Sequence, residues 1–469
     1  MYKRFLTLLL LLLLIVPLAH AQKKFQPVSD TALIVDSIEI SGNKITKERI
    51  ILRELEMKTG DTLYPHDLAQ KIKQSRENLL NQSLFNFVDI TTTRYDFNKI
   101  KLLVKVTERW YIWPVPILTY ADRNFNIWWK NKDFKRTNFG IDLTIYNFRG
   151  RKERLDFIFQ EGYDKTLSLE WHIPYINYAQ KWGLVLSGGL VYNHETDYGL
   201  HNSKKLYYRE DDQFVRKQYF AKIGATYRPK YRITHTFYLC FYQDRFADSL
   251  QILNPTFAYG PNRYSYFTLE YNFKLDYRDY APYPLRGYYF EFNALKEGLN
   301  LLDKKVNLFS FYLVFDQYFK LSKRWFFAYN ISSKVVTNRY QPYFLQKGLG
   351  FLPMTIRGYQ LHIVNGQQIA LMRSNLKFEL IPKKVMDIPF IKSNKFGKIF
   401  YAIYANLFFD AGYVADRQSP VPPSLNNKLL YSTGIGLDIV SYYDVVLRLE
   451  YSINRQKEKG FFISFIAPI

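Results

Sequence analysis

The stretch FTLEYNFKLDYRD, residues 267–279, alternates strictly between two kinds of side chain. Every odd position from 267 to 277 is aromatic or leucine, and every even position from 268 to 278 is polar or charged. A period of two indicates a β-strand, because successive side chains point to opposite faces. Twelve residues at about 3.3 Å each span about 40 Å, far more than a typical globular strand of about five or six residues. Such a strand is typical of a sheet that crosses a bilayer, with one apolar face and one wet face.

The same alternation returns in NLFSFYLVFDQYF (307–319) and YYFEFNAL (288–295), and helical periodicity disappears after Trp110. Polar breaks separate the strands, as in NFRGRKER, where Gly150 favours a turn. About 360 residues at about 22 per strand and connection give about sixteen strands. Residues 110–469 are therefore predicted to form a transmembrane antiparallel β-barrel, since lipid requires a closed sheet. The alternative, a soluble all-β sandwich, does not need strands of this length.

Composition supports a membrane barrel in two ways. The chain holds 40 Tyr and 38 Phe, which suits aromatic girdles at the two membrane boundaries. The mean hydropathy of −0.25 would normally indicate a soluble protein, but barrels hide their lipid face in alternation. Of the net charge of +23, residues 110–469 carry +18. We expect a basic lumen or contact with anionic lipid head groups rather than binding of nucleic acid.

The first residues have the pattern of a secretory signal peptide. Lys3 and Arg4 precede an apolar run over residues 5–17, and Ala19-His20-Ala21 is a small-x-small cleavage site. A retained membrane helix is disfavoured because the apolar run is short. We therefore predict a signal peptide over residues 1–21 and a linker over 22–32.

Residues 33–109 predict a small α+β domain with the order β-α-α-β-β. Thr46 is the expected cap of a helix through ERIILREL, and Pro65 lies in the first turn of a second helix. Two β-rich runs follow around a turn at residues 96–98. The order resembles a POTRA domain, the periplasmic module of outer-membrane translocation proteins, with local similarity in SGNKIT and LFNFVDI. A generic α+β domain is the alternative.

The predicted barrel contains the motifs Ile356-Arg357-Gly358-Tyr359 and Phe408-x-Asp410-x-Gly412. They resemble motifs of the BamA/two-partner-secretion superfamily of outer-membrane barrels, also called the bacterial surface antigen family. In that family an extracellular loop folds into the lumen carrying Val/Ile-Arg-Gly-Phe/Tyr, and the wall carries Phe-x-Asp-x-Gly. The resemblance implies that Arg357 of the loop reaches Asp410 of the wall and locks the two together. The alternative is two solvated charges that never meet. The matching residues are Arg357, Gly358 and Tyr359 in the loop, and Phe408, Asp410 and Gly412 in the wall.

A third match is the family's hairpin Asp-x-Arg-Asp…Pro-x-x-Gly, which here is Asp276, Arg278, Asp279, Pro284 and Gly287. The resemblance implies a structural role for these five residues. The chain departs from the family in having room for one POTRA domain, where relatives carry two or more. It also leaves open whether Glu379 or no residue fills the acidic position that usually follows the loop motif.

The sequence gives no pattern for catalysis. The seven histidines include no His-x-x-x-His pair, and the single cysteine, Cys240, excludes an intramolecular disulfide and a cysteine-based metal cluster. There is no Gly-x-Ser-x-Gly elbow and no Gly-rich phosphate loop. We predict no enzymatic activity, no cofactor and no metal, although scattered Ser/His or Asp/His sites of barrel enzymes would escape this search.

The resemblance implies an outer-membrane pore that inserts or translocates polypeptides in a Gram-negative-type cell. The POTRA domain would lie in the periplasm and capture extended clients by adding a β-strand, and the Arg357 loop would gate the barrel. Expected partners are outer-membrane lipids, unfolded or extended client polypeptides and accessory subunits, without nucleic acid. The alternatives are an accessory or structural barrel without translocation activity, and a passive porin.

Overall fold

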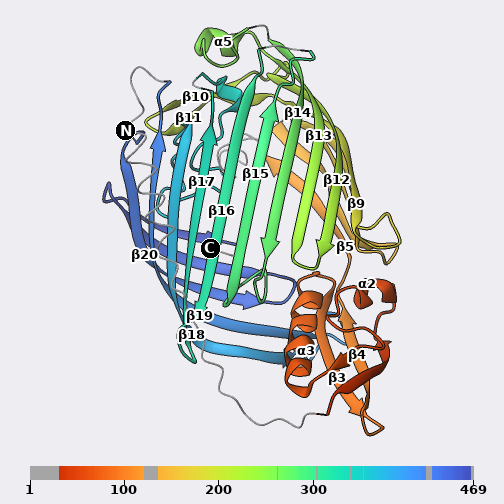
Figure 1. The fold of residues 1–469 in the computed structure, drawn as a ribbon. Helices are drawn as coiled ribbons and strands as arrows, with labels where there is room; N and C mark the ends of the chain where they lie inside the picture. The colour runs from red at the N-terminus through yellow and green to blue at the C-terminus, as the bar shows by residue number, and fades with distance from the viewer. Residues whose placement is uncertain are drawn as a thin grey trace.

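The computed structural model describes residues 31–120, 136–260, 262–302, 305–338, 340–351, 353–393, 395–418 and 425–465. The predicted signal peptide and residues 22–30 of the predicted linker lie outside these ranges. The described residues form a large antiparallel barrel with a small N-terminal domain against one end (Figure 1). Among these residues, no helix combines the length and apolar character required to cross a membrane.

Sixteen strands form the barrel sheet, and each described pair of neighbours is antiparallel. The order follows the chain from β5 to β22, except that β9 pairs with β12 across the separate hairpin β10–β11. The predicted antiparallel barrel of about sixteen strands, preceded by an α+β domain, is confirmed. The barrel strands are β5 (Ile112–Tyr120), β6 (Thr137–Phe148), β7 (Glu153–Gly162), β8 (Lys165–Ile173), β9 (Trp182–Asn193), β12 (Arg216–Lys230), β13 (Ile233–Phe246), β14 (Arg263–Asp276), β15 (Gly287–Glu297), β16 (Leu308–Lys320), β17 (Trp325–Val336), β18 (Gln368–Asp387), β19 (Lys398–Ala415), β20 (Leu429–Ser441), β21 (Val446–Asn454) and β22 (Lys459–Ser464).

The alternation of β14 separates the two faces of the wall. On the outer face Leu269 is 48% exposed, beside exposed apolar side chains of the neighbouring strands. On the inner face Glu270 accepts a hydrogen bond from Asn293, and Lys274 lies 3.6 Å from Glu291. The polar even positions therefore pair inside the barrel, as the two-residue period predicts.

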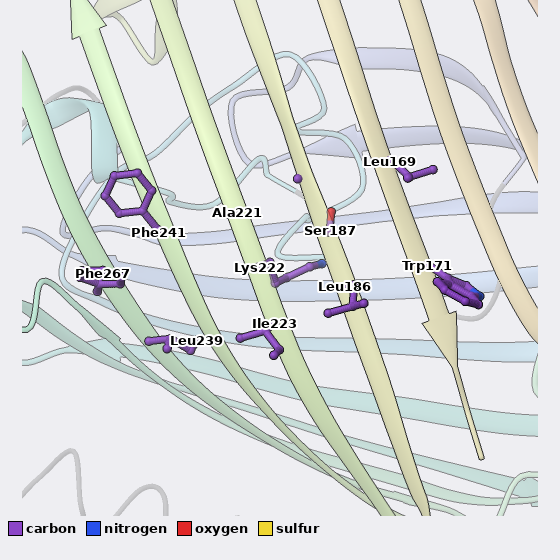
Figure 2. Close-up of a pocket in the computed structure, with 11 residues that line it drawn as sticks. Leu169, Trp171, Leu186, Ser187, Ala221, Lys222, Ile223, Leu239, Phe241 and Phe267 are labelled. Atoms are coloured by element: carbon purple, nitrogen blue, oxygen red, sulfur yellow. The ribbon is translucent and has the colours of Figure 1, made fainter. Parts of the chain in front are cut away.

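The outer wall is hollowed over β8, β9, β12, β13 and β14 (Figure 2). Gly188 and Ala221 are cross-strand partners here, so the wall lacks long side chains at its centre. Apolar side chains surround the hollow, while Lys222 of the same strand as Ala221 donates its Nζ to Glu170. The surrounding apolar residues are Leu169, Trp171, Leu186, Ile223, Leu239, Phe241 and Phe267.

The β18–β19 hairpin is longer than its neighbours. β17 pairs with β18 only as far as Phe378, and β20 pairs with β19 only as far as Tyr401. Residues 385–387 and 398–400 pair with each other beyond these limits. The ends of β18 and β19 thus form a two-stranded ribbon on the side of the N-terminal domain, where Asn86 donates to the carbonyl oxygen of Lys395 at 3.0 Å.

The N-terminal domain is a four-stranded sheet covered by helices. Its elements are β1 (Leu33–Ser41), α2 (Glu48–Leu52), β2 (Thr62–Leu63), α3 (Pro65–Leu80), β3 (Phe85–Arg94) and β4 (Lys99–Glu108). The sheet order is β2-β1-β4-β3, with β1 parallel to β4 and β3 at one edge. Leu79 of α3 packs into a core with Val35, Phe85 and Leu102. Pro65 begins α3, as its position in the sequence predicts.

The first helix of this domain differs from its prediction. α2 is only five residues long, and Lys47 rather than Thr46 precedes it as the cap residue. The Thr46 hydroxyl donates instead to Glu108 Oε1 at 2.7 Å and accepts from Asn147 Nδ2 at 2.8 Å. Glu108 and Asn147 come from distant parts of the chain. Because the Thr46 hydroxyl bonds to these residues, it does not cap the helix as the local sequence predicts.

At the end of the barrel opposite the N-terminal domain lie the β10 (Glu195–His201)–β11 (Lys204–Arg209) hairpin, α5 (Ser249–Leu253) and the turn η2 (Tyr343–Leu345). Aromatic side chains hold these segments together: Phe257 contacts Phe246 and Phe344 at ring-centroid distances of 5.0 and 6.0 Å. Tyr343 donates to Asp197 at 2.9 Å. This end of the barrel is therefore covered by packed loops.

Candidate functional site

The loop between β17 and β18 folds back into the barrel lumen. Leu349, Met354, Ile356 and Tyr359 of the loop are buried in one apolar cluster with wall residues of β18, β19 and β20. The wall members of this cluster are Ile369, Leu371, Val414 and Leu430. The packing holds the loop against one side of the barrel and positions the residues between Ile356 and Tyr359.

Arg357 and Asp410 lie in direct contact in the lumen. The guanidinium donates from Nε to Asp410 Oδ2 at 2.8 Å and from Nη2 to Oδ1, which is a bidentate pair. The backbone N–H of Arg357 also donates to Asp410 Oδ2 at 3.1 Å. Asp410 has no exposed surface and Arg357 is 9% exposed, so water screens this pair little.

The remaining donors of Arg357 reach three further strand positions. Nη1 donates to Asn375 Oδ1 at 2.7 Å and lies 3.4 Å from Glu450 Oε1, and Nη2 donates to the Ser374 carbonyl at 3.1 Å. The guanidinium also stacks on the ring of Phe408, 3.9 Å from its centroid. Contacts on β18, β19 and β21 thus fix one loop side chain to three strands of the wall.

The other motif residues bring the loop backbone close to the wall. Gly358 has a φ of +81°, and its carbonyl accepts from Asn454 at 2.9 Å. The Tyr359 hydroxyl donates to the Tyr431 carbonyl at 3.4 Å. Gly412 leaves room for the loop, because a Cβ at this position would lie 2.5 Å from Ile356 Cδ1. All six residues named by the loop and wall motifs therefore meet in one place.

The hairpin motif between β14 and β15 is folded around Asp279. Asp279 Oδ1 accepts from the backbone N–H groups of Tyr280, Leu285 and Arg286 at 2.9–3.2 Å. Arg278 forms a bidentate pair with Asp276. These contacts organise the turn that contains the buried Pro284 and ends at Gly287.

The same hairpin sends Tyr283 into the barrel. Tyr283 is 3% exposed and donates to Asp438 Oδ2 at 2.8 Å. Arg448 donates to the other oxygen of Asp438 at 2.8 Å, and Lys377 Nζ lies 4.2 Å from the Tyr283 ring centroid. The lumen is thus occupied from one end by the Arg357 loop and from the other by the hairpin.

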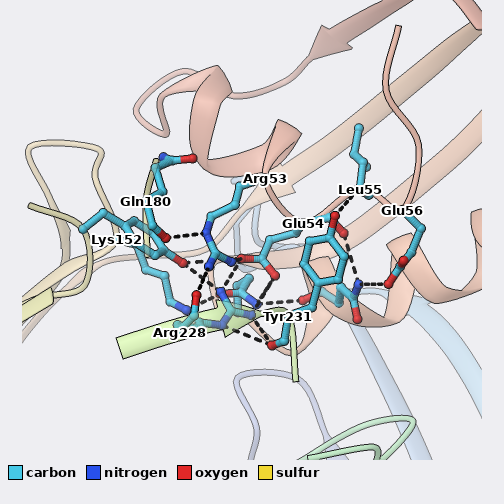
Figure 3. Close-up of polar contacts among 11 residues, drawn as sticks. Arg53, Glu54, Leu55, Glu56, Lys152, Gln180, Arg228 and Tyr231 are labelled. Atoms are coloured by element: carbon cyan, nitrogen blue, oxygen red, sulfur yellow. Dashed lines mark hydrogen bonds and ion pairs between the residues drawn. The ribbon is translucent and has the colours of Figure 1, made fainter. Parts of the chain in front are cut away.

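Ion pairs join the N-terminal domain to the barrel rim (Figure 3). Arg228 donates to both oxygens of the buried Glu54 at 2.6 and 2.9 Å. Arg53 donates to the carbonyls of Gln180 and Arg228, and Tyr231 donates to the Leu55 carbonyl at 2.9 Å. Burial raises the pKa of Glu54, but the positive charges of Arg228, Lys152 and Arg53 together hold that pKa below its ordinary value.

A second set of contacts attaches the domain to the β20–β21 turn. Arg109 donates to both oxygens of Asp444 at 2.7 and 2.9 Å, and Ser83 and Tyr280 donate to the same carboxylate. Asn81 completes the attachment by accepting from the backbone N–H of Ala281 at 2.9 Å. The domain is therefore fixed to the barrel at several separate turns.

Sequence reasoning missed part of this site. The sequence left open whether Glu379 fills the acidic position that follows the loop motif. In the structure Glu379 accepts a hydrogen bond from Tyr404 at 3.2 Å, and Glu450 instead approaches Arg357. Asn375 and Glu450 lie in ordinary strand alternation, and only the register of β18 and β21 brings them to the loop. Among the described residues, no group of three or more His, Cys, Asp or Glu side chains is arranged to hold a metal ion.

Family models match both parts of the chain. The Omp85 superfamily domain matches residues 147–462, and the surface antigen variable number repeat, a POTRA domain, matches residues 33–109. The chain belongs to the Omp85 superfamily. A search of curated proteins gave no match.

Solved structures show the same architecture at low sequence identity. CdiB from Escherichia coli superposes with a TM-score of 0.51 at 11% identity, covering 94% of this chain and 75% of CdiB. BamA from Haemophilus ducreyi lacking POTRA domains 1–3 gives a TM-score of 0.49 at 14% identity, covering 92% of this chain and 83% of that one. The CdiB match shows that the two chains share a fold.

Proposed function

We propose that this Omp85 protein is an outer-membrane pore that inserts or translocates extended polypeptides, with its POTRA domain in the periplasm. The observation that supports the proposal is the buried Arg357–Asp410 contact, which holds the loop between β17 and β18 to the inner wall of the barrel by charge. A passive porin needs no such closure and no capture domain. The proposed work is mechanical rather than catalytic.

The proposed capture surface is the edge strand β3. It pairs with β4 on one side only, and its residues 91–94 are exposed. An exposed edge presents unpaired backbone N–H and C=O groups, so an extended client can add a strand there. The Asn86–Lys395 contact places the β18–β19 ribbon beside the start of β3, and the client would then pass toward the barrel.

The gate is tested by Arg357→Ala and Asp410→Ala, each measured for conductance in planar bilayers and for client assembly in cells. Removing one partner of a buried pair costs about 3–5 kcal/mol, so the loop should leave the wall and conductance should rise. Arg324→Ala is the matched control, because Arg324 is an exposed arginine at the rim that donates to the carbonyls of Glu379 and Leu380 and lies over the ring of Phe378. Unchanged conductance and client assembly in both lock variants would remove the gate.

A second candidate is an accessory barrel without translocation activity, favoured by the firm attachment of the POTRA domain to the rim. Depletion of the protein followed by a census of outer-membrane proteins separates the two. Broad loss of barrels supports insertion, loss of one client supports dedicated secretion, and an unchanged census supports the accessory role.

A further inference from the structure

A cleft of about 1050 Å³ opens between the POTRA domain and the barrel rim. One side consists of α2 and the residues after it, together with Ile38 and Gln74. The other side consists of the turns β8–β9 and β12–β13, together with Tyr277 at the end of β14. The cleft lies beside the Glu54–Arg228 pair but is separate from the lumen site.

The side chains that line this cleft are strongly basic. Six cationic residues face one carboxylate, Glu56. Arg53 and Arg232 have acidic neighbours, at 3.2 Å from Glu54 and 3.9 Å from Glu77. Across the described ranges the other four have no carboxylate within ion-pair distance: Arg49, Lys58, Lys181 and Lys230. Like charges gathered in a concave site attract an anion, because its binding relieves their mutual repulsion.

Aromatic side chains place the cleft at the level of a membrane boundary. Tyr178 in the cleft is fully exposed, and Trp182, four residues on, contacts Tyr227 of the outer wall with tilted rings whose centroids are 4.7 Å apart. On the other side Tyr277 stacks on Tyr288 at 4.9 Å, and Arg232 lies 4.9 Å from the Tyr277 ring centroid. Such belts of Tyr and Trp mark the interface between hydrocarbon and water. The basic groups are therefore at the depth of lipid head groups.

We propose that this cleft binds the phosphate of an anionic phospholipid in the leaflet on the POTRA side. Lysine and arginine form charge-assisted hydrogen bonds to phosphate oxygens, and basic groups at a membrane surface attract anionic lipid. The acyl chains would lie on the apolar outer wall beyond Trp182, which a soluble anion cannot use. The lipid would fill the junction between the POTRA domain and the barrel. This site does not depend on the proposed translocation activity.

The test titrates the full-length protein in neutral detergent with dioctanoyl phosphatidylglycerol, followed by calorimetry, with dioctanoyl phosphatidylcholine as the zwitterionic comparison. The cleft variant is Lys181→Gln with Lys230→Gln, and the matched control is Lys44→Gln with Lys105→Gln, two exposed lysines of the POTRA domain outside the cleft. At about 1 kcal/mol per basic residue, the cleft variant should bind phosphatidylglycerol about thirtyfold more weakly. The control should bind as the unaltered protein does.

Equal affinity for the two lipids, or equal affinity of the cleft variant and the unaltered protein, would overturn the proposal. Inorganic phosphate and hexaglutamate are added as competitors. Displacement of the lipid by either at comparable concentration would assign the cleft to a soluble anion or an acidic peptide instead. If the first variant does not fold, Arg49→Gln with Lys58→Gln tests the same cleft from the POTRA side.

Discussion

The guanidinium of Arg357 has five N–H groups, and five acceptor contacts surround them. A buried charge is tolerated only when it is paired and its hydrogen bonds are made, and here both conditions hold. The planar fork matters as well as the charge, because it reaches a carboxylate and an amide in one plane while its face rests on Phe408. A lysine at this position would keep the charge and lose most of these contacts.

We expect a second cation, the half-buried Lys152 in the β6–β7 turn, to make the POTRA junction sensitive to pH. Its Nζ donates to Gln82. Burial lowers the pKa of Lys152 to about 7, Arg228 acts in the same direction, and Glu54 opposes them. The unfolded chain, with an ordinary lysine pKa of about 10.4, binds the extra proton between these two values. Stability should therefore rise as the pH increases from about 7 toward 10.5.

We predict that the urea midpoint of the purified protein increases between pH 6 and pH 9, and that Lys152→Met removes part of this increase. Lys44→Met, at an exposed lysine of the POTRA domain, should leave the increase unchanged. The same pH dependence in both variants would show that Lys152 is charged in the folded protein throughout this range.

At the level of single residues, the sequence predicted only those contact partners of Arg357 that belong to a motif. Arg357 and Asp410 belong to two short motifs, and the resemblance of these motifs to those of the family implied a pairing between them. Asn375 is 18 residues from Arg357 and Glu450 is 93 residues away, and neither stands out from its strand. Their approach depends on strand register around the barrel, which local patterns do not encode.

Among the elements, the β14–β15 hairpin is defined by its backbone. Gly287 has a φ of +96°, and a Cβ there would lie 2.0 Å from the Tyr277 carbonyl oxygen. Glycine is therefore required at position 287 for two reasons, the left-handed backbone conformation and the close approach of the Tyr277 backbone. Because the turn carries Tyr283 into the lumen, its shape sets the position of a side chain that contacts β20 and packs beside β19.

Gly287→Ala should destabilise the barrel more than Gly60→Ala, measured as the free energy of unfolding in urea. Gly60 has a similar φ of +92° but nothing within 4 Å of an added Cβ, so it reports backbone strain alone. Strain of this kind costs about 1–3 kcal/mol, and the collision at Gly287 adds to it. Equal losses in the two variants would mean that the hairpin shifts freely away from Tyr277.

Elements also show where pattern reasoning is strong and where it is weak. The strict alternation in β14 and β16 predicted long strands correctly, because every residue obeys the same two-sided environment. The helix through ERIILREL ended after five residues, since Arg53 and Glu54 turn toward the barrel and make contacts there. Hydrophobic periodicity predicts an element well when each of its faces has a uniform environment. It predicts poorly where a segment contacts another domain.

For the whole molecule, the decisive feature is the junction between the two domains. Glu54 meets Arg228, Arg109 meets Asp444, and Asn81 meets the β14–β15 hairpin. Composition indicated two regions of different character but carried no signal for this joining, because its partners are far apart in the sequence, by 70 residues for Gln82 and Lys152 and by 335 for Arg109 and Asp444. Contacts with buried charges at several turns make the POTRA domain and barrel one mechanical unit.

Arg228→Met should therefore separate the unfolding of the two domains. It leaves Glu54 buried beside fewer positive charges, at a cost of about 3–5 kcal/mol, so the POTRA domain should unfold in an earlier calorimetric transition than the barrel. Arg324→Met is the control, because Arg324 is an arginine at the rim outside the junction. An unchanged thermogram for Arg228→Met would show that the Arg109–Asp444 set alone couples the domains.

The places at which the POTRA domain is attached have one further consequence. On one side it binds the turns β6–β7, β8–β9 and β12–β13, which follow the first strand of the sheet, and on the other the turn β20–β21, which precedes the last. The domain thus contacts turns near both ends of the strand order, which are β5 and β22, and also the β14–β15 turn between them. A movement that separates β5 from β22 has to break the contacts of the domain with the turns on one side. Otherwise the domain has to move together with the turns on the other side. A client bound at β3, as proposed above, would then move with the part of the barrel wall to which the POTRA domain remains bound.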